Sequence, residues 1–83
     1  MRFLYRIVEG EVKMPDDQKY FTYGVRAYRQ QHQTWVCTAD VRDISPNRRF
    51  VQQLVQLYNR LQLDPDHLYD VVQDAVIDEN SSF

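Results

Sequence analysis

The sequence predicts an α+β fold, in which a three-stranded antiparallel β-meander carries a C-terminal αα-hairpin packed on one face, in the order βββαα. Three runs within residues 2–42 alternate apolar with polar side chains, as strands with one buried face do. Two runs within residues 45–77 repeat apolar side chains every three or four positions, and each opens with a capping residue followed by proline. We therefore expect the helical pair to cover the apolar face of the sheet.

The 83 residues have the length of one domain, which we expect over residues 1–77, with a disordered C-terminal tail over residues 78–83. The apolar share of 43% suffices for one modest core. A single cysteine, Cys37, excludes an internal disulfide and fits a reducing compartment. The N-terminus lacks the uninterrupted apolar run of a signal peptide, and no segment of the sequence could span a bilayer. We therefore expect a cytoplasmic protein.

The first expected strand, residues 2–14, changes the parity of its inward-facing side chains once. Before the change the inward side chains are Phe3, Tyr5 and Ile7. After Gly10 the inward set moves by one position, to Val12 and Met14. Because a period of two changes parity only where a residue is inserted, we predict a β-bulge at Glu9-Gly10, with Gly10 at a positive φ.

The second and third expected strands, residues 19–29 and 33–42, pair through their inward side chains. Those of the second strand are Phe21, Tyr23, Val25 and Ala27. Those of the third strand are Trp35, Cys37, Ala39 and Val41. A register that places Val25 opposite both Ile7 and Cys37 matches every inward residue to another inward residue. The second strand is therefore expected at the centre of the sheet.

Each expected helix opens with the same combination of residue types. Ser45 and Asp64 are the predicted N-caps, and Pro46 and Pro65 follow at the first helical position. The apolar stripe of the first helix is Phe50, Leu54, Leu57, Tyr58 and Leu61, widened by Val51 and Val55. That of the second helix is Leu68, Val71, Val72, Ala75 and Val76. Because only about two or three residues separate the helices, we expect them to lie antiparallel.

An acidic stripe runs along the second expected helix. Its members recur at every fourth residue and are Asp66, Asp70, Asp74 and Asp78. Like charges at this spacing repel each other by about a few tenths of a kcal/mol per pair. Two interpretations are open: a solvated helix face, or a docking surface for a basic partner with Asp70 and Asp74 as binding residues.

The outer sheet face, which the helices are expected to leave uncovered, carries a second unusual pattern. The expected register places Arg6 directly opposite Arg26, although like charges in that position destabilise a sheet. The apolar side chains expected around the two arginines are Leu4, Val8, Tyr28 and Val36. Either both arginines extend into water over these neighbours, or the face contacts a partner through Arg6, Arg26 and Tyr28.

The sequence contains no pattern that indicates chemistry. His67 lies where a capping or packing role suits it, and Cys37 is expected in the core beside Trp35, where its thiol would be inert. The sequence has no glycine-rich phosphate loop, no Ser-His-Asp order and no spaced group of metal ligands. We therefore expect no catalytic, metal-binding or cofactor-binding residue, and a protein that is not an enzyme.

Together these surfaces predict a small protein-interaction or regulatory module that acts through the outer sheet face or the acidic face of the second helix. The alternative is a single-stranded nucleic-acid binder that uses Arg and Tyr of the outer face. The net charge of −2 argues against a general affinity for nucleic acid or for an anionic membrane. The expected partner is an unidentified protein. Any homodimer is expected to be weak, because two paired outer faces would bring four arginines together.

Four short segments carry a resemblance to a known family. They are Tyr23-Gly24, Asp43-Ile44-Ser45, Tyr58-Asn59 and the run from Leu63 to Val72, which contains Asp64-Pro65, His67-Leu68 and Asp70-Val71-Val72. With these segments the chain resembles an uncharacterised family of short proteins from clostridia and related Firmicutes, known as a domain of unknown function. The resemblance covers most of residues 3–76. It implies a bacterial cytoplasmic setting and assigns no activity and no site.

Overall fold

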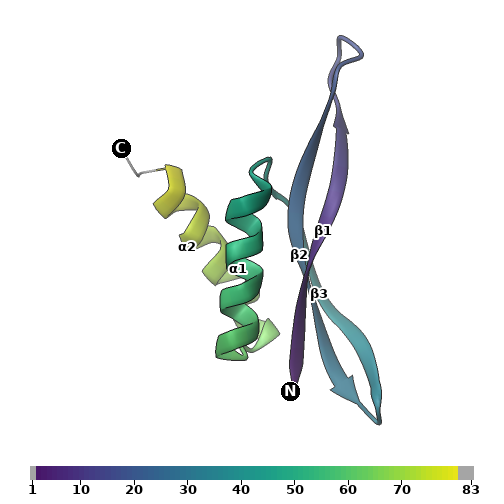
Figure 1. Ribbon diagram of the computed structural model, residues 1–83, viewed down its shortest axis with the longest axis vertical. Coiled ribbons are helices and arrows are strands. Elements are labelled where there is room, and N and C mark those ends of the chain that lie inside the picture. The colour runs from purple at the N-terminus through teal and green to yellow at the C-terminus, as the bar shows by residue number, and fades with distance from the viewer. Residues whose placement is uncertain (1, 81–83) are drawn as a thin grey trace.

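The computed structural model describes residues 2–80 and has the predicted α+β architecture. In chain order the elements are β1 (Phe3–Lys13), β2 (Lys19–Gln31), β3 (Thr34–Ser45), α1 (Arg48–Leu61), the short 3-10 helix η1 (Pro65–His67) and α2 (Leu68–Asn80). The strands form one antiparallel sheet in the order β1-β2-β3, with β2 in the centre as expected. Figure 1 shows both helices on the same side of this sheet, which confirms the βββαα order and the single covered face.

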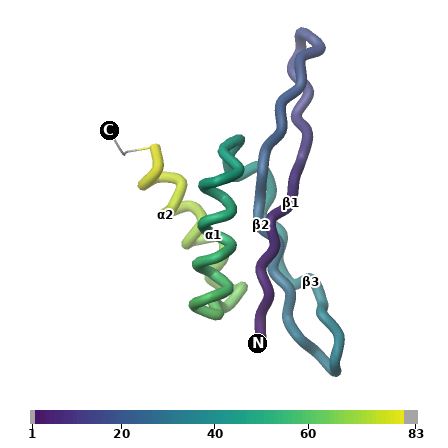
Figure 2. The backbone as a smooth tube through the Cα atoms, viewed as in Figure 1, coloured from purple at the N-terminus to yellow at the C-terminus, as the bar shows by residue number. Residues whose placement is uncertain are grey.

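The sheet is much longer than the helices that cover it, and the molecule measures 47 × 30 × 18 Å. Figure 2 shows the β1–β2 hairpin extending beyond the helices at one end and the β2–β3 hairpin extending beyond them at the other. Apolar side chains on these projecting ends are exposed, among them Met14, Tyr20, Phe21, Trp35 and Val36. The apolar core is therefore confined to the middle of the sheet.

The core lies between the inner sheet face and the two helical stripes, as the sequence predicts. Its buried side chains are Phe3, Tyr5, Val25 and Ala27 from the sheet, Val51, Leu54 and Tyr58 from α1, and Leu68 and Val72 from α2. Leu61 is the exception, because it closes the predicted stripe of α1 and yet is 62% exposed. Leu61 is the last residue of α1 and lines an open groove between α1 and α2, so its side chain is not covered by the sheet or by α2.

Two side-chain amides at the end of α1 bind the free edge of β1. Asn59 accepts a hydrogen bond from the Tyr5 N–H (Oδ1···N 2.7 Å) and donates one to the Tyr5 carbonyl (Nδ2···O 2.9 Å). Gln62 accepts from the Phe3 N–H (3.0 Å) and donates to the Phe3 carbonyl (3.0 Å). Each amide thus pairs with the strand backbone as a residue of a neighbouring strand would. We call this pair of residues the amide clamp.

The predicted bulge at Glu9-Gly10 is wrong. β1 pairs with β2 without a register shift from Phe3 opposite Arg29 to Lys13 opposite Lys19, and Gly10 does not have a positive φ. Val12 consequently lies on the outer face, and Met14 follows the strand as an exposed residue. The physical reason is that this part of β1 projects beyond the helices, so no buried face selects inward apolar side chains there.

The irregularities of the sheet lie in β3 instead. Thr38 is an extra residue between the pair Ala27–Ala39 and the pair Tyr28–Cys37. This insertion changes the parity of the strand, so Cys37 faces outward opposite Tyr28 and is exposed, which corrects the prediction that Cys37 and Trp35 point into the core. Val25, predicted opposite Cys37, pairs with Val41, whereas the predicted pairing of Val25 with Ile7 is confirmed.

A second irregularity in β3 requires a glycine in β2. Three residues, 42–44, stand opposite Gly24 between the pairs Tyr23–Ser45 and Val25–Val41, and Asp43 has a φ of 55°. A Cβ atom on Gly24 would overlap the Val41 carbonyl oxygen and lie 2.7 Å from the Cα of Arg42. The backbone of β3 can therefore approach this closely only where β2 has no side chain.

The helix ends agree with the prediction at α2 and differ at α1. Asp64 caps η1 by accepting from the Asp66 N–H (3.0 Å), with Pro65 at its first position. At α1 the cap is Asn47, which accepts from the Phe50 N–H. Ser45, the predicted cap, instead accepts from the Asn47 N–H (3.0 Å) while still paired in the sheet, so the helix begins two residues later than predicted.

Residues 78–80, the first part of the predicted disordered tail, are the last residues of α2. The helix continues through Asn80, because no proline or glycine ends it at residue 78. Glu79, within this last turn, is half-buried. Residues 81–83, the rest of the predicted tail, lie outside the described residues.

A pair of glycine substitutions tests the sheet geometry. Gly24→Ala should lower the free energy of unfolding by about 2 kcal/mol or more, because the added Cβ would overlap backbone atoms of β3. Gly10→Ala is the matched control, since its Cβ would lie 3.7 Å from the Thr22 Cγ2 in ordinary contact. Chemical denaturation measures both, and a greater loss for Gly10→Ala would contradict the assignment of the close approach to Gly24.

Candidate functional site

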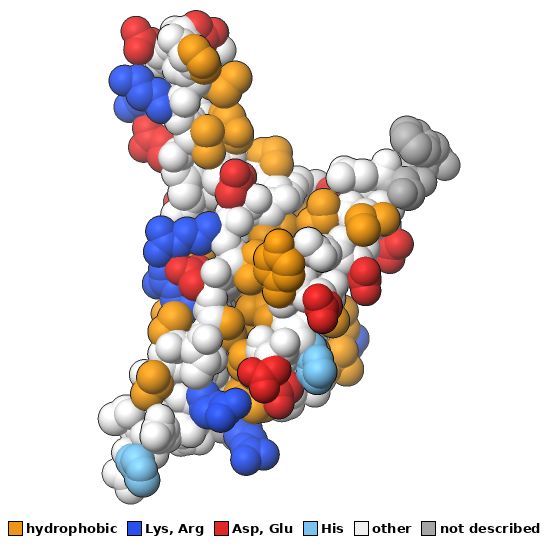
Figure 3. Space-filling view, turned by 180° about the vertical axis from the view of Figure 1, so that it is seen from behind, with side chains coloured by type: hydrophobic (Ala, Val, Ile, Leu, Met, Phe, Trp, Pro, Cys, Tyr) orange, Lys and Arg blue, Asp and Glu red, His pale blue; other side chains and the backbone are white. Residues whose placement is uncertain are grey.

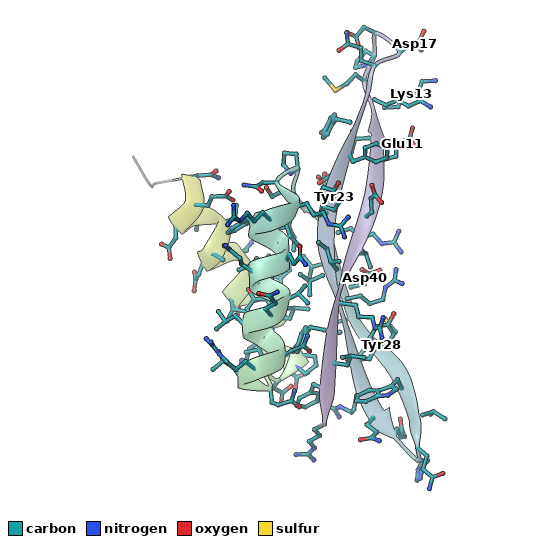
Figure 4. The ribbon with its side chains drawn as sticks, in the orientation of Figure 1. Glu11, Lys13, Asp17, Tyr23, Tyr28 and Asp40 are labelled. Carbon is teal, nitrogen blue, oxygen red and sulfur yellow. The ribbon has the colours of Figure 1, made fainter. Side chains whose placement is uncertain are left out.

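The candidate site is the outer face of the sheet, which neither helix covers. Strand alternation places on it Leu4, Arg6, Val8, Gly10 and Val12 from β1, Tyr20, Thr22, Gly24, Arg26 and Tyr28 from β2, and Trp35, Cys37 and Asp40 from β3. Figure 4 shows Tyr28 and Asp40 on the side of the sheet away from the helices. The face therefore combines arginine and aromatic side chains with small apolar residues.

The centre of this face is a charged cluster in which two arginines share one carboxylate and a third arginine lies beside them. Arg6 lies directly opposite Arg26, as the sequence predicts. Asp40 accepts from both Arg26 (Nη2···Oδ2 3.4 Å) and Arg42 (Nε···Oδ2 2.9 Å). The Tyr28 hydroxyl and then the Asp40 carboxylate raise the pKa of the Arg26 guanidinium. We call Arg6, Arg26, Arg42 and Asp40 the arginine cluster; its formal charge is positive because one carboxylate cannot neutralise three guanidinium groups.

A hollow of about 350 Å³ adjoins the arginine cluster. Its lining includes Val8, Gly10, Val12, Thr22, Gly24, Arg26, Arg42 and Asp43. Thr22 is buried and donates a short hydrogen bond to Asp43 (Oγ1···Oδ1 2.6 Å), which holds the bulged segment of β3 beside β2. The hollow forms because two glycines provide no side chains at the point where β3 bends across the sheet. It is large enough to receive a side chain of a partner.

Two aromatic residues lie near the other end of the arginine cluster. Tyr28 is half-buried on the outer face, as predicted, and Trp35 is 42% exposed there. Val36, predicted on this face, lies on the opposite one, paired with Arg29. The sequence pattern missed Trp35 because a large apolar side chain is read as part of the core, and no residue signals the insertion at Thr38 that turns it outward.

The structure separates the two groups of predicted binding residues. Arg6, Arg26 and Tyr28 belong to the outer sheet face, whereas Asp70 and Asp74 are exposed on α2, on the other side of the sheet. Figure 3 shows Lys and Arg side chains gathered at mid-length of the sheet and Asp and Glu side chains along α2. The two groups therefore form separate surfaces with charges of opposite sign.

The residues that most often carry chemistry are dispersed. His32, His67 and Cys37 are all exposed, and they lie at the β2–β3 turn, in η1 and in β3 respectively. Within residues 2–80, no group of three or more His, Cys, Asp or Glu side chains is arranged as metal ligands. No helix of this described part of the chain is long and apolar enough to cross a membrane.

Comparison with known proteins places the chain in a family. The profile of DUF6514, a family of unknown function, matches residues 1–78, and the chain belongs to this family. No curated protein matches the sequence, and no solved structure matches the fold. The expected resemblance to a domain of unknown function is thus confirmed, and the family assigns no activity to the chain.

The arginine cluster predicts a measurable cost when its carboxylate is neutralised. Asp40→Asn should lower the free energy of unfolding by up to about 1 kcal/mol at low salt, because Arg26 and Arg42 lose the carboxylate that they share. Salt should reduce this loss, since the remaining repulsion is screened. Asp70→Asn makes the same chemical change at an exposed position and should leave stability unchanged or slightly higher. If Asp40→Asn and Asp70→Asn lowered the free energy of unfolding equally in denaturation experiments, Asp40 would not stabilise the arginine cluster.

Proposed function

We propose that this member of the DUF6514 family is a small cytoplasmic protein-interaction or regulatory module of bacteria, and that it binds its partner through the outer sheet face. One observation carries the proposal: the arginine cluster, the hollow and the exposed Trp35 lie together on a sheet face that no helix covers. Arginine, tyrosine and tryptophan are the residues most enriched where proteins bind one another. A sheet face of this composition is more typical of a protein interface than of a surface that remains exposed to solvent.

Binding suits this chain better than catalysis. The core occupies only the middle of the sheet, and most polar groups of the outer face are exposed. Catalysis needs positioned groups that exclude water from the reacting atoms. A binding surface needs only complementary shape and charge, and a small domain can supply both without an enclosed pocket. We therefore assign no catalytic residue and no cofactor.

The partner surface should be acidic. Three guanidinium groups and one carboxylate give the arginine cluster a positive charge, and Arg42 is well exposed beside the hollow. An acidic side chain of a partner would pair with Arg42 or Arg6 while an apolar neighbour enters the hollow. A second copy of the chain is a poorer partner for this face, because two arginine clusters would repel each other. Self-association through it is accordingly expected to be weak.

Single-stranded nucleic acid is the second candidate for the same face. Trp35, which the structure adds to Tyr28 and Arg26, would supply another surface on which a base can stack. Asp40 opposes this reading, because a carboxylate at the centre of the cluster would lie close to the phosphates. The net charge of −2 opposes it too. A protein partner is therefore the function that we propose.

Charge reversal on the outer face tests the proposal. Affinity capture from an extract of the native cell would compare the wild type with Arg26→Glu and with Arg49→Glu. Arg49 is exposed on α1, so its reversal makes the same change in net charge away from the outer face. We expect one or more proteins to be captured by the wild type and by Arg49→Glu, and to be lost with Arg26→Glu. Equal capture by all three variants would contradict a role for this face.

A direct titration separates the two candidates. Fluorescence anisotropy with labelled single-stranded RNA should show no binding in the micromolar range at about 50 mM salt, if the partner is a protein. Tight binding that weakens steeply as the salt is raised to about 200 mM, and that Arg26→Glu abolishes, would favour the nucleic-acid reading instead.

A further inference from the structure

A groove between α1 and α2 forms a surface distinct from the outer sheet face. Figure 1 shows α2 diverging from α1 toward its C-terminal end, so the two antiparallel helices enclose a wedge. The groove within this wedge has a volume of about 260 Å³. Its walls are almost entirely apolar and comprise Leu54, Leu57, Tyr58, Leu61, Leu63, Val71 and Ala75. The predicted αα-hairpin is therefore splayed, and part of its two stripes remains unpacked.

Both walls of the groove are exposed to some degree, and the most exposed side chain lies on α1. Leu61 is 62% exposed, although leucine at this stripe position is expected to be buried. Leu57, Val71 and Ala75 are only partly buried. Exposed apolar walls facing each other across a groove lose the contacts that a packed helix pair would make.

One residue of the groove lining carries a buried polar group that has no hydrogen-bond partner in the described part of the chain. Tyr58 lines the groove and is 4% exposed, and its hydroxyl has no hydrogen-bond partner within residues 2–80. An unpaired buried hydroxyl is uncommon, and this one belongs to a residue of the groove lining.

The rim of the groove is acidic on one side. Asp74 and Asp78 of the acidic stripe line it, and both are exposed. Asp70 continues the same stripe one turn earlier along α2. Within the described residues, none of these aspartates lies within ion-pair distance of a basic side chain. The rim therefore presents negative charge, without a basic partner among the described residues, beside the apolar groove.

We propose that the groove docks a basic amphipathic helix of a partner protein. The apolar stripe of that helix would pack between Leu61 on α1 and Val71 and Ala75 on α2, as in other helix-in-groove complexes. Lysine or arginine on the flank of the helix would pair with Asp74 and Asp78. The proposal rests on the groove alone and does not depend on the outer sheet face.

The described helices of a second copy do not fit as the occupant. The α2 helix of a second copy carries the same acidic stripe as the rim, so the two negative charges would repel each other. Most of the apolar stripe of α1 is buried in its own core through Val51, Leu54 and Tyr58, and the exposed remainder around Leu61 is too short to fill the groove of another copy. The acidic charge of α2 and the burial of the α1 stripe therefore both favour a helix from another protein as the occupant.

Peptide probes test the proposal on the full-length chain. The probe is a fluorescein-labelled amphipathic peptide of Leu and Lys, about 18 residues or five helical turns long. Its controls are the Leu/Glu analogue and a scrambled Leu/Lys sequence of the same composition. By anisotropy we expect the amphipathic Leu/Lys peptide to bind at least about tenfold more tightly than either control. In a ¹H–¹⁵N NMR titration, the shifts that move should be those of Leu57, Leu61, Val71 and Ala75.

Three variants separate docking in the groove from general charge attraction. Asp74→Lys/Asp78→Lys should weaken binding at least about tenfold, whereas Glu9→Lys/Asp16→Lys makes the same change in net charge on the β1–β2 hairpin and should have little effect. Leu61→Ser should also weaken binding without unfolding the chain, because Leu61 is largely exposed. Arg26→Glu should leave peptide binding unchanged, so failure of the outer-face proposal would be seen separately.

The opposite results would overturn the proposal. They are no binding of the amphipathic Leu/Lys peptide, equal binding of the scrambled peptide, or equal weakening by the two charge-reversal pairs. The occupant would be a second copy if the wild type dimerises in sedimentation experiments and Leu61→Ser abolishes the dimer. That result would also overturn docking of a foreign helix.

Discussion

The structure depends on the amide clamp that joins α1 to the edge of β1. Asn59 and Gln62 each donate to and accept from the strand backbone, so two side chains stand where a fourth strand would begin. The clamp fixes the end of α1 over Phe3 and Tyr5 and thereby sets which part of the long sheet is covered. Edge groups of a sheet need partners or protection, and here a helix supplies them. The β1–β2 hairpin, beyond the reach of the helix, stays in solvent.

This one-sided cover gives the small domain two surfaces of opposite charge. Residues 1–42 carry a net charge of +2 and residues 43–83 a net charge of −4, and the fold places the strands and the helices in different layers. The arginine cluster consequently lies on the outer sheet face, and the acidic stripe lies beside the groove between α1 and α2. The two proposals together describe a domain that binds an acidic partner on one surface and a basic partner on the other.

The sequence predicts the order of the elements, both helical stripes and the pair Arg6–Arg26, because each follows from a local period. It could not predict the insertions at Thr38 and residues 42–44, since a period of two gives the parity of a strand but not the place where that parity changes. The unshifted parity therefore predicts Trp35 in the core, whereas the insertion at Thr38 turns it outward. Gly24 is the one residue that signals the close approach of β3, whereas Gly10, where we predicted the bulge, lies in regular pairing.

Amide hydrogen exchange along β1 tests the clamp most directly. The N–H groups of Phe3 and Tyr5 should exchange slowly, because each donates to a side-chain amide held by α1. By strand alternation the N–H groups of Ile7 and Glu9 point to the same edge, where no partner lies within the described residues, and they should exchange rapidly. Exchange at Tyr5 as fast as at Glu9 would contradict the clamp, and with it the explanation of why the helices cover only this part of the sheet.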